Sequence, residues 1–171
     1  MPRITAEPVS TDRLDLLPLR VEYAAEMAAV LADPALHRFI GGAPYSAPDL
    51  RARYERLVAG SPDPAVSWCN WVLLLRAESC LVGTVQATVG ADGGAEIAWV
   101  VGTAWQGRGY ASEAARGLVG WLGRHSVRTV VAHVHPDHLA SAAVAAAAGL
   151  SATEEEQDGE TRWRRSERPP A

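Results

Sequence analysis

Apolar residues recur at helical spacing in two segments of the first third of the chain. Segments 21–31 and 49–59 each place an apolar residue every three or four positions, the pattern of an amphipathic helix. Between them, residues 37–45 combine aromatic residues with Gly41, Gly42 and Pro44, a composition typical of a shaped loop. The pattern therefore predicts two helices joined by a structured loop.

The middle of the chain changes to the patterns of β-strands. Apolar runs cover 71–76, 81–89 and 95–101, and the turn residues of segment 91–94 separate the last two. Strands joined by short turns pair with their neighbours in antiparallel fashion. We therefore predict a three-stranded antiparallel meander.

The remaining residues alternate between helix and strand patterns. Segment 111–122 carries one apolar helical stripe, and segment 128–134 alternates and is β-branched, so it is predicted to run parallel to 95–101 after a helical crossover. A second helix is predicted over 139–148 with Gly149 as its C-cap, followed by a hairpin of 150–156 and 160–165. Residues 168–171 are expected to fray, and the length suits one domain over 1–171.

A glycine-rich turn connects strand 95–101 to the helix that follows it. Gly107 and Gly109 allow a tight turn, and the helix aims its unpaired N–H groups at the same place, which together form a cradle for a phosphate. Glycine also occurs in such connections for conformational reasons alone. The turn lacks a Gly-Lys-Ser/Thr ending and comes too late in the chain for an N-terminal dinucleotide fold, which excludes two familiar phosphate loops.

The residues of this turn resemble a family signature. Residues 106–111 read QGRGYA and match the Gln/Arg-x-x-Gly-x-Gly/Ala pattern of the GNAT acyltransferase superfamily. Segments 14–20, 32–34 and 138–150, in this order, resemble its ribosomal-protein N-acetyltransferase-like (RimJ/RimL-type) branch, so the resemblance covers nearly the whole chain. It implies an α+β, three-layer fold with a mixed central sheet of about seven strands, splayed between the fourth and fifth, and about four flanking helices.

The resemblance also implies an activity. Members transfer an acetyl group from acetyl-coenzyme A to a primary amine, on a protein N-terminus or a small molecule, by direct attack in a ternary complex without a metal. A second class stays open, a GNAT-fold module that binds acyl-coenzyme A without turnover. Its basis is that the positions of the family's usual asparagine and tyrosine on the last helix hold His138 and Ala145.

On the family pattern, two stretches contact coenzyme A. The backbone of the splayed strand would pair with the pantetheine arm, and the backbone amides of the glycine turn would bind the pyrophosphate. The Arg108 side chain adds a charge, and His138 occupies a cofactor-contacting position. The residues concerned are Trp99, Val100 and Val101 of the strand, then Gln106, Gly107, Arg108, Gly109, Tyr110, Ala111 and Ser112 of the turn. Core packing is a second reading of Trp99 and the valines.

The resemblance also suggests residues for the chemistry. Glu96 occupies the position from which the family commonly supplies a carboxylate that helps to deprotonate the amine; an ordinary surface glutamate is the alternative. Ser141 occupies a position near the sulfur and is a candidate proton donor to the leaving thiolate, although its hydroxyl could only satisfy backbone groups of the helix.

Aromatic residues and histidines complete the candidate site. Phe39, Tyr45 and Trp68 are candidate acceptor contacts, with core packing as the alternative, which is the stronger one for Phe39. His133, His135 and His138 invite a metal hypothesis, but only Asp137 could complete the ligand set, so a cofactor-facing or substrate-facing role is favoured. Cys69 and Cys80 lie in apolar, strand-like segments and are expected to be buried free thiols.

Charge and composition exclude several partners. The net charge of −4 argues against a general nucleic-acid binder, and all 16 basic residues are arginine. The arginines of segments 51–56 and 162–165 follow a helix and a strand and are expected to be solvated. No leader or long apolar run is apparent, so a cytoplasmic protein without membrane partners is expected, and its oligomeric state, including a homodimer, stays open.

Overall fold

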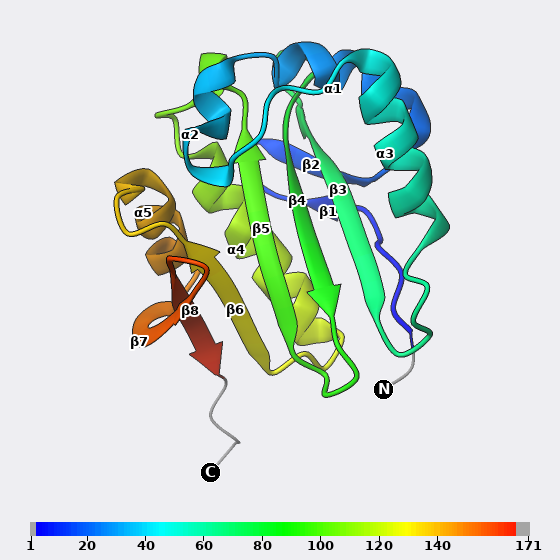
Figure 1. The fold of residues 1–171 in the computed structure, drawn as a ribbon. Helices are drawn as coiled ribbons and strands as arrows, with labels where there is room; N and C mark the ends of the chain where they lie inside the picture. Colours follow the sequence, from blue (N-terminus) through cyan, green and yellow to red (C-terminus); the bar gives the residue numbers. More distant parts are fainter. Residues whose placement is uncertain (1–2, 167–171) are drawn as a thin grey trace.

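The fold is built on a mixed sheet of eight strands in the order β1-β2-β3-β4-β5-β6-β8-β7 (Figure 1). A computed structural model describes residues 3–166. The strands are β1 (Val9–Ser10), β2 (Leu14–Pro18), β3 (Ser67–Leu75), β4 (Cys80–Val89), β5 (Ala95–Val101), β6 (Thr129–Val134), β7 (Ser151–Gln157) and β8 (Glu160–Ser166). The α-helices are α1 (Ala24–Val30), α2 (His37–Ile40), α3 (Ala47–Ala59), α4 (Tyr110–Arg124) and α5 (Leu139–Ala147).

The sheet is antiparallel except for one parallel pair of neighbouring strands. Strands β1 to β5 pair in antiparallel fashion, β5 and β6 are parallel, and β8 pairs with both β6 and β7 in antiparallel fashion. The parallel pair follows from α4, which connects β5 to β6 as a crossover. The predicted meander, parallel strand and final hairpin are therefore confirmed.

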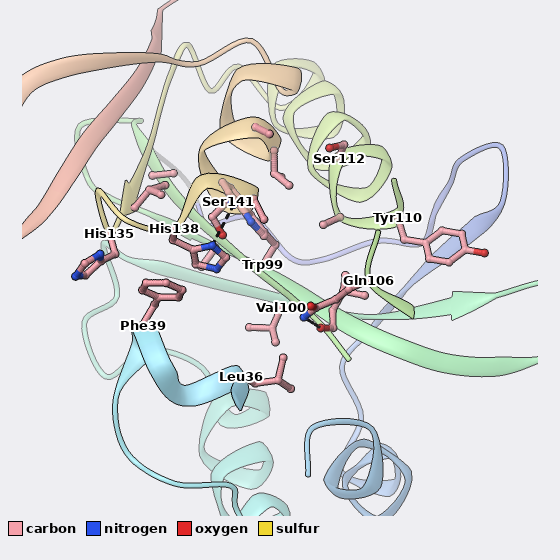
Figure 2. Close-up of a pocket in the computed structure, with 18 of the residues that line it drawn as sticks. Leu36, Phe39, Trp99, Val100, Gln106, Tyr110, Ser112, His135, His138 and Ser141 are labelled. Carbon is pink, nitrogen blue, oxygen red and sulfur yellow. Dashed lines mark hydrogen bonds between the residues drawn. The ribbon is translucent and has the colours of Figure 1, made fainter. Parts of the chain in front are cut away.

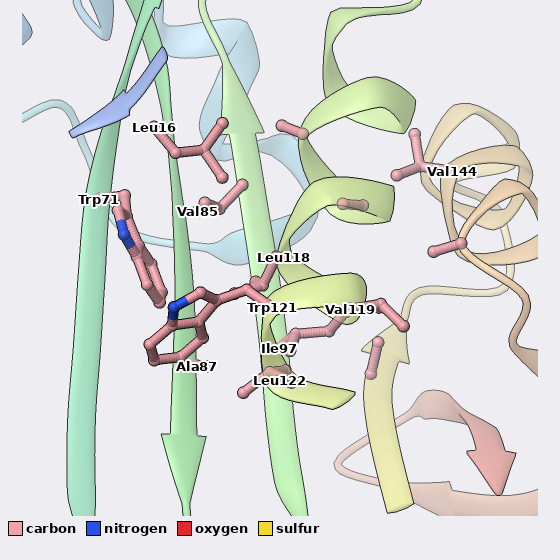
Figure 3. Close-up of a cluster of buried hydrophobic side chains, with 14 of the residues drawn as sticks. Leu16, Trp71, Val85, Ala87, Ile97, Leu118, Val119, Trp121, Leu122 and Val144 are labelled. Atoms are coloured by element: carbon pink, nitrogen blue, oxygen red, sulfur yellow. The ribbon is translucent and has the colours of Figure 1, made fainter. Parts of the chain in front are cut away.

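The helices cover both faces of the sheet, as neighbouring residues of one strand show. Trp71 packs into a core with α4 and α5, whereas Val72 packs into a second core under α1 and α3. Side chains alternate across a strand, so the two cores lie on opposite faces. In the larger core the Trp71 and Trp121 rings meet edge to face at 5.0 Å (Figure 3). The three-layer α+β prediction is confirmed.

Two short elements were not predicted. β1 has two residues and adds an eighth strand, and α2 has four residues and lies inside the segment expected to be a loop. Elements this short carry no periodic signal that a sequence pattern can reveal. The predicted frayed residues 168–171 lie outside the described residues.

Candidate functional site

The parallel strands β5 and β6 diverge soon after they pair. Their register pairs join only Ala95 to Val130 and Glu96 to Val131. Beyond these pairs lies a cavity of about 640 Å³, lined by residues 97–101 of β5 and 132–134 of β6. The strands predicted over 95–101 and 128–134 thus splay apart, as the family resemblance implies. Strand edges without a partner expose N–H and C=O groups that can pair with an extended ligand.

The glycine turn and the start of α4 close one end of this cavity. Gly109 is the N-cap of α4 with φ +81°, and no side chain caps the helix. The first N–H groups of an uncapped helix lack intrahelical partners and favour an anion. Of the predicted cofactor residues, Trp99, Val100, Val101, Gln106, Gly107, Gly109, Tyr110, Ala111, Ser112 and His138 line the cavity, and several of them appear in Figure 2.

Arg108 is the predicted cofactor residue that does not line the cavity. Its side chain is exposed, and its carbonyl faces the protein, where it accepts a hydrogen bond from the Arg13 guanidinium at 2.8 Å. The side chain of Gln106 also has an internal partner, because its Nε2 donates to the Val101 carbonyl at 3.0 Å. The turn is therefore held to β5 and to the segment before β2 by side-chain contacts that do not use the backbone N–H groups of residues 107–109.

Arg13, which lies near the start of the chain, holds the turn in place. Its Nε binds Glu113 Oε1 at 2.7 Å, and its guanidinium lies 4.4 Å from the centroid of the Tyr110 ring. Burial acts to raise the pKa of Glu113, but hydrogen bonds from Thr11 and Arg13 prevail and lower it. Glu113 is therefore an anion at neutral pH, fixed under the first turn of α4. The separation of 100 residues between the partners hides this brace from the sequence pattern.

α5 begins on the other side of the cavity with His138 as its N-cap. The backbone N–H of Ser141 donates to His138 Nδ1 at 3.3 Å, and the Phe39 ring of α2 stacks on the imidazole at 4.4 Å (Figure 2). Burial, and then the neighbouring His135, lower the pKa of His138. A neutral imidazole with an acceptor at Nδ1 is what the cap requires.

We expect stability to fall as the pH drops below about 6.5, the ordinary histidine pKa. The unfolded chain then takes up a proton on His138 before the native protein does, so unfolding is favoured. His138→Asn keeps a side-chain cap that cannot titrate. Denaturant unfolding at pH 7.5 and 5.5 should show a smaller loss for His138→Asn than for the parent. Equal losses would contradict the prediction.

Glu96 and His133 face each other across the splay. Glu96 Oε1 lies 2.8 Å from His133 Nδ1, so the carboxylate accepts a hydrogen bond from the Nδ1–H of the imidazole. His133 lines the cavity, whereas Glu96 is exposed beside it and does not. His133 Nε2 is buried without a hydrogen-bond partner among the described residues. The pair thus holds a histidine that lines the cavity and has an unused lone pair on Nε2.

The three candidate acceptor residues do not come together. Phe39 lines the cavity, but Tyr45 and Trp68 do not. Tyr45 is 46 % exposed in the segment before α3, and Trp68 is 37 % exposed on β3. Trp68 pairs with Thr88, which pairs with Glu96, so Trp68 lies on the same sheet face as Glu96, two strands away. Phe39 is partly exposed, so the reading of it as a core aromatic is also incomplete.

The remaining candidates have ordinary environments. No group of three or more histidine, cysteine or acidic side chains within residues 3–166 is arranged to hold a metal ion. Cys69 is buried, and burial raises its pKa to about 11, whereas Cys80 is only partly buried; both are free thiols. Ala145 is completely buried in the larger core and does not line the cavity. None of the helices in the described part of the chain is long and apolar enough to cross a membrane.

Comparison with known proteins assigns the chain to a family. The sequence model of a family described as "Acetyltransferase (GNAT) domain" matches residues 13–151, which is more than half of the chain. No curated protein sequence matches the chain significantly.

Solved structures share the fold at low sequence identity. The ribosomal alpha-N-protein acetyltransferase RimL in complex with coenzyme A has a TM-score of 0.78 at 16% identity, covering 94% of this chain and 98% of its own. An acetyltransferase from Agrobacterium tumefaciens has a TM-score of 0.72 at 23% identity, covering 96% of each chain. AAC(6')-Ib in complex with paromomycin and acetyl-CoA has a TM-score of 0.73 at 17% identity, covering 91% of this chain and 94% of its own.

Proposed function

Because this chain belongs to the GNAT acetyltransferase family, we propose that it transfers an acetyl group from acetyl-coenzyme A to a primary amine. The observation that carries the proposal is the cavity between β5 and β6, which ends at the uncapped start of α4. An extended arm can pair with the free edge of β5, and an anion can bind the α4 amides. This cradle fits a nucleotide thioester with a pyrophosphate, which supplies the activated acetyl group.

The acceptor amine must lose a proton before it attacks. Near pH 7.5 about a third of an α-amine is neutral, but only about a thousandth of a lysine amine is. Transfer forms a carbon–nitrogen bond, breaks the carbon–sulfur bond, and moves one proton from nitrogen to sulfur overall. We propose that the Glu96–His133 pair accepts the amine proton, with Glu96 holding the imidazole and stabilising its charged form.

We propose Ser141 as the proton donor to the leaving thiolate. It lines the cavity on the first turn of α5, and its contact to His138 uses the backbone N–H and not the hydroxyl. A thiol with a pKa of about 8.5 is a fair leaving group without help, so the contribution is modest.

Ser141→Ala should therefore lower turnover by about tenfold or less and leave coenzyme A affinity nearly unchanged. Steady-state rates and calorimetry on the same preparation measure both quantities. Full activity would assign the proton to water, and a collapse in affinity would move Ser141 to the binding site. Rescue by Ala145→Tyr is not expected, because a ring at this buried position would overpack the core.

The branch and the compartment are finer parts of the proposal. We place the chain in the RimJ/RimL-type branch on the motifs of residues 14–20, 32–34 and 138–150, with a protein N-terminus or a small amine as acceptor. The RimL fold similarity supports the fold part of this assignment. Two free cysteines, one of them completely buried, suit a reducing compartment such as the cytoplasm.

Thiol release from acetyl-coenzyme A over a panel of amines tests the proposal. Release that depends on an added amine supports an acetyltransferase. The competing function is a module that binds acyl-coenzyme A without turnover, suggested by His138 and Ala145 at the family's asparagine and tyrosine positions. Tight binding of acetyl-coenzyme A without release for any amine would favour that module.

A further inference from the structure

A second, smaller cavity lies at the start of β5 and β6, on the opposite side of their paired residues from the first cavity. It encloses about 300 Å³, and three of its lining residues are arginines. Arg128 comes from the segment before β6, whereas Arg162 and Arg164 come from β8. From the sequence alone Arg162 and Arg164 are expected to be solvated on a strand, and Arg128 is not singled out. The fold instead gathers them around one hollow.

The arginines of β8 are well placed to hold an anion. Arg162 and Arg164 are two residues apart on one strand, so both side chains project from the same face. Arg162 binds Glu155 at 3.2 Å through one terminal nitrogen, but its Nε is buried without a hydrogen-bond partner among the described residues. An unsatisfied guanidinium N–H is costly when buried, and a carboxylate or phosphate would satisfy it.

Among the described residues that line this cavity, one is acidic and three are arginines. Asp92 is the acidic residue of the lining, and its Oδ1 accepts a hydrogen bond from the Gly94 N–H at 2.9 Å. Glu155 is engaged with Arg162. Arg128 is exposed at the rim. Among the described residues that line the cavity, arginines therefore outnumber acidic residues, in a chain whose net charge is −4.

The two cavities share the strands that bound them. On β8, Glu160 lines the first cavity and Arg162 lines the second. On the β5 side, Ile97 lines the first and Gly94 lines the second, three residues earlier. At roughly 3.3 Å per residue the two cavities are about 10 Å apart along the strand. The Glu96–His133 pair lies between them, because Glu96 follows Gly94 and His133 is the register partner of Arg162.

We propose that the arginine cavity binds an anionic group of the acceptor, a carboxylate or phosphate about 10 Å from the amine that is acetylated. The inference rests on the proposed acetyltransferase function, and it names the class of substrate. A spacing of about 10 Å corresponds to three residues of an extended peptide. Suitable acceptors are therefore short peptides with a free carboxylate or protein N-termini with an acidic third residue, and polycationic amines are poor acceptors.

Matched peptides test this subsite. The first pair is a tripeptide with a free C-terminal carboxylate and its C-terminal amide; the second is an amidated hexapeptide with glutamate or glutamine at the third position. We expect the charged member of at least one pair to have a KM about tenfold lower at similar kcat, since an arginine–carboxylate contact stabilises binding. The difference should shrink at high salt. A KM difference in the first pair would identify a terminal carboxylate as the bound anion, and one in the second pair would identify an acidic side chain.

Variants separate the subsite from the reaction. Arg128→Gln combined with Arg164→Gln should abolish the preference for the charged peptide and leave kcat on the neutral peptide unchanged. The control combines Arg20→Gln with Arg116→Gln, which removes two exposed arginines outside both cavities, and it should keep the preference. Equal KM values for charged and neutral peptides in the parent protein would overturn the subsite while acetylation continued. No transfer to any peptide or other amine would overturn the acetyltransferase function itself.

Discussion

Replacement of Glu96 by glutamine is expected to lower the rate of acetyl transfer by roughly 10²–10⁴-fold below the pKa of the acceptor amine, and by less above it. Glutamine keeps an oxygen that can accept from His133 Nδ1–H, so the geometry of the 2.8 Å contact survives and only the charge is lost. Without that charge the imidazole is a weaker proton acceptor. Above its own pKa the amine is already neutral and needs less help.

The pH profile of kcat/KM measures this effect, with two further variants as references. His133→Gln should cause a similar loss, and the double variant should be little worse than either single one, because the two residues act as a unit. Glu154→Gln changes an exposed glutamate of β7 outside the cavity and should have no effect. A uniform loss at every pH for Glu96→Gln would indicate that Glu96 positions the substrate and does not assist deprotonation.

The second large effect is expected for Gly109→Val, which should weaken coenzyme A binding by tenfold or more. Gly109 has φ +81°, and a Cβ there would lie 3.3 Å from the Arg13 guanidinium that braces the turn. A β-branched residue disfavours this backbone conformation by about 1–2 kcal/mol and would place bulk where the pyrophosphate approaches. Loss of one charge-assisted hydrogen bond costs about 1.5–3 kcal/mol, which corresponds to at least tenfold in affinity.

Gly159→Val provides the matched control. Gly159 also has φ +81°, lies in the β7–β8 hairpin, and has no atom within 4 Å of the added Cβ. It should lose stability through the same backbone strain and keep its affinity for coenzyme A. Calorimetry on both folded variants gives the comparison. Unchanged affinity in Gly109→Val would remove the turn from the pyrophosphate site.

Local patterns predicted much of the fold, and the family resemblance added one side of the site. The glycine turn and the parallel strand after α4 depend on residues close in sequence, whereas the splay of β5 from β6 was implied by the resemblance; the structure has all three as expected. His138 and Ser141 likewise meet at the start of α5, because a cap and its first turn are three residues apart. Short-range chemistry of this kind can be read along a chain.

Contacts between distant segments could not be read in this way. The pairing of Glu96 with His133 depends on the register of two parallel strands, and the brace of Arg13 under α4 joins residues about 100 positions apart. A shift of one residue in the register of β5 and β6 would point Glu96 and His133 to opposite faces of the sheet. The same limit applies to the gathering of Arg128 with Arg162 and Arg164, and to Tyr45 and Trp68, candidate acceptor contacts that do not line the first cavity.

The most direct test of the account is the stoichiometry of a single reaction with acetyl-coenzyme A and an amine that supports thiol release. Free thiol is measured by a colorimetric reagent, and the acetylated amine and the intact protein are measured by mass spectrometry. The account predicts equal amounts of thiol and acetylated amine, with no acetyl group on the protein. Thiol release without acetylated amine, or accumulation of an acetylated protein, would contradict direct transfer between ligands held in the β5–β6 cavity.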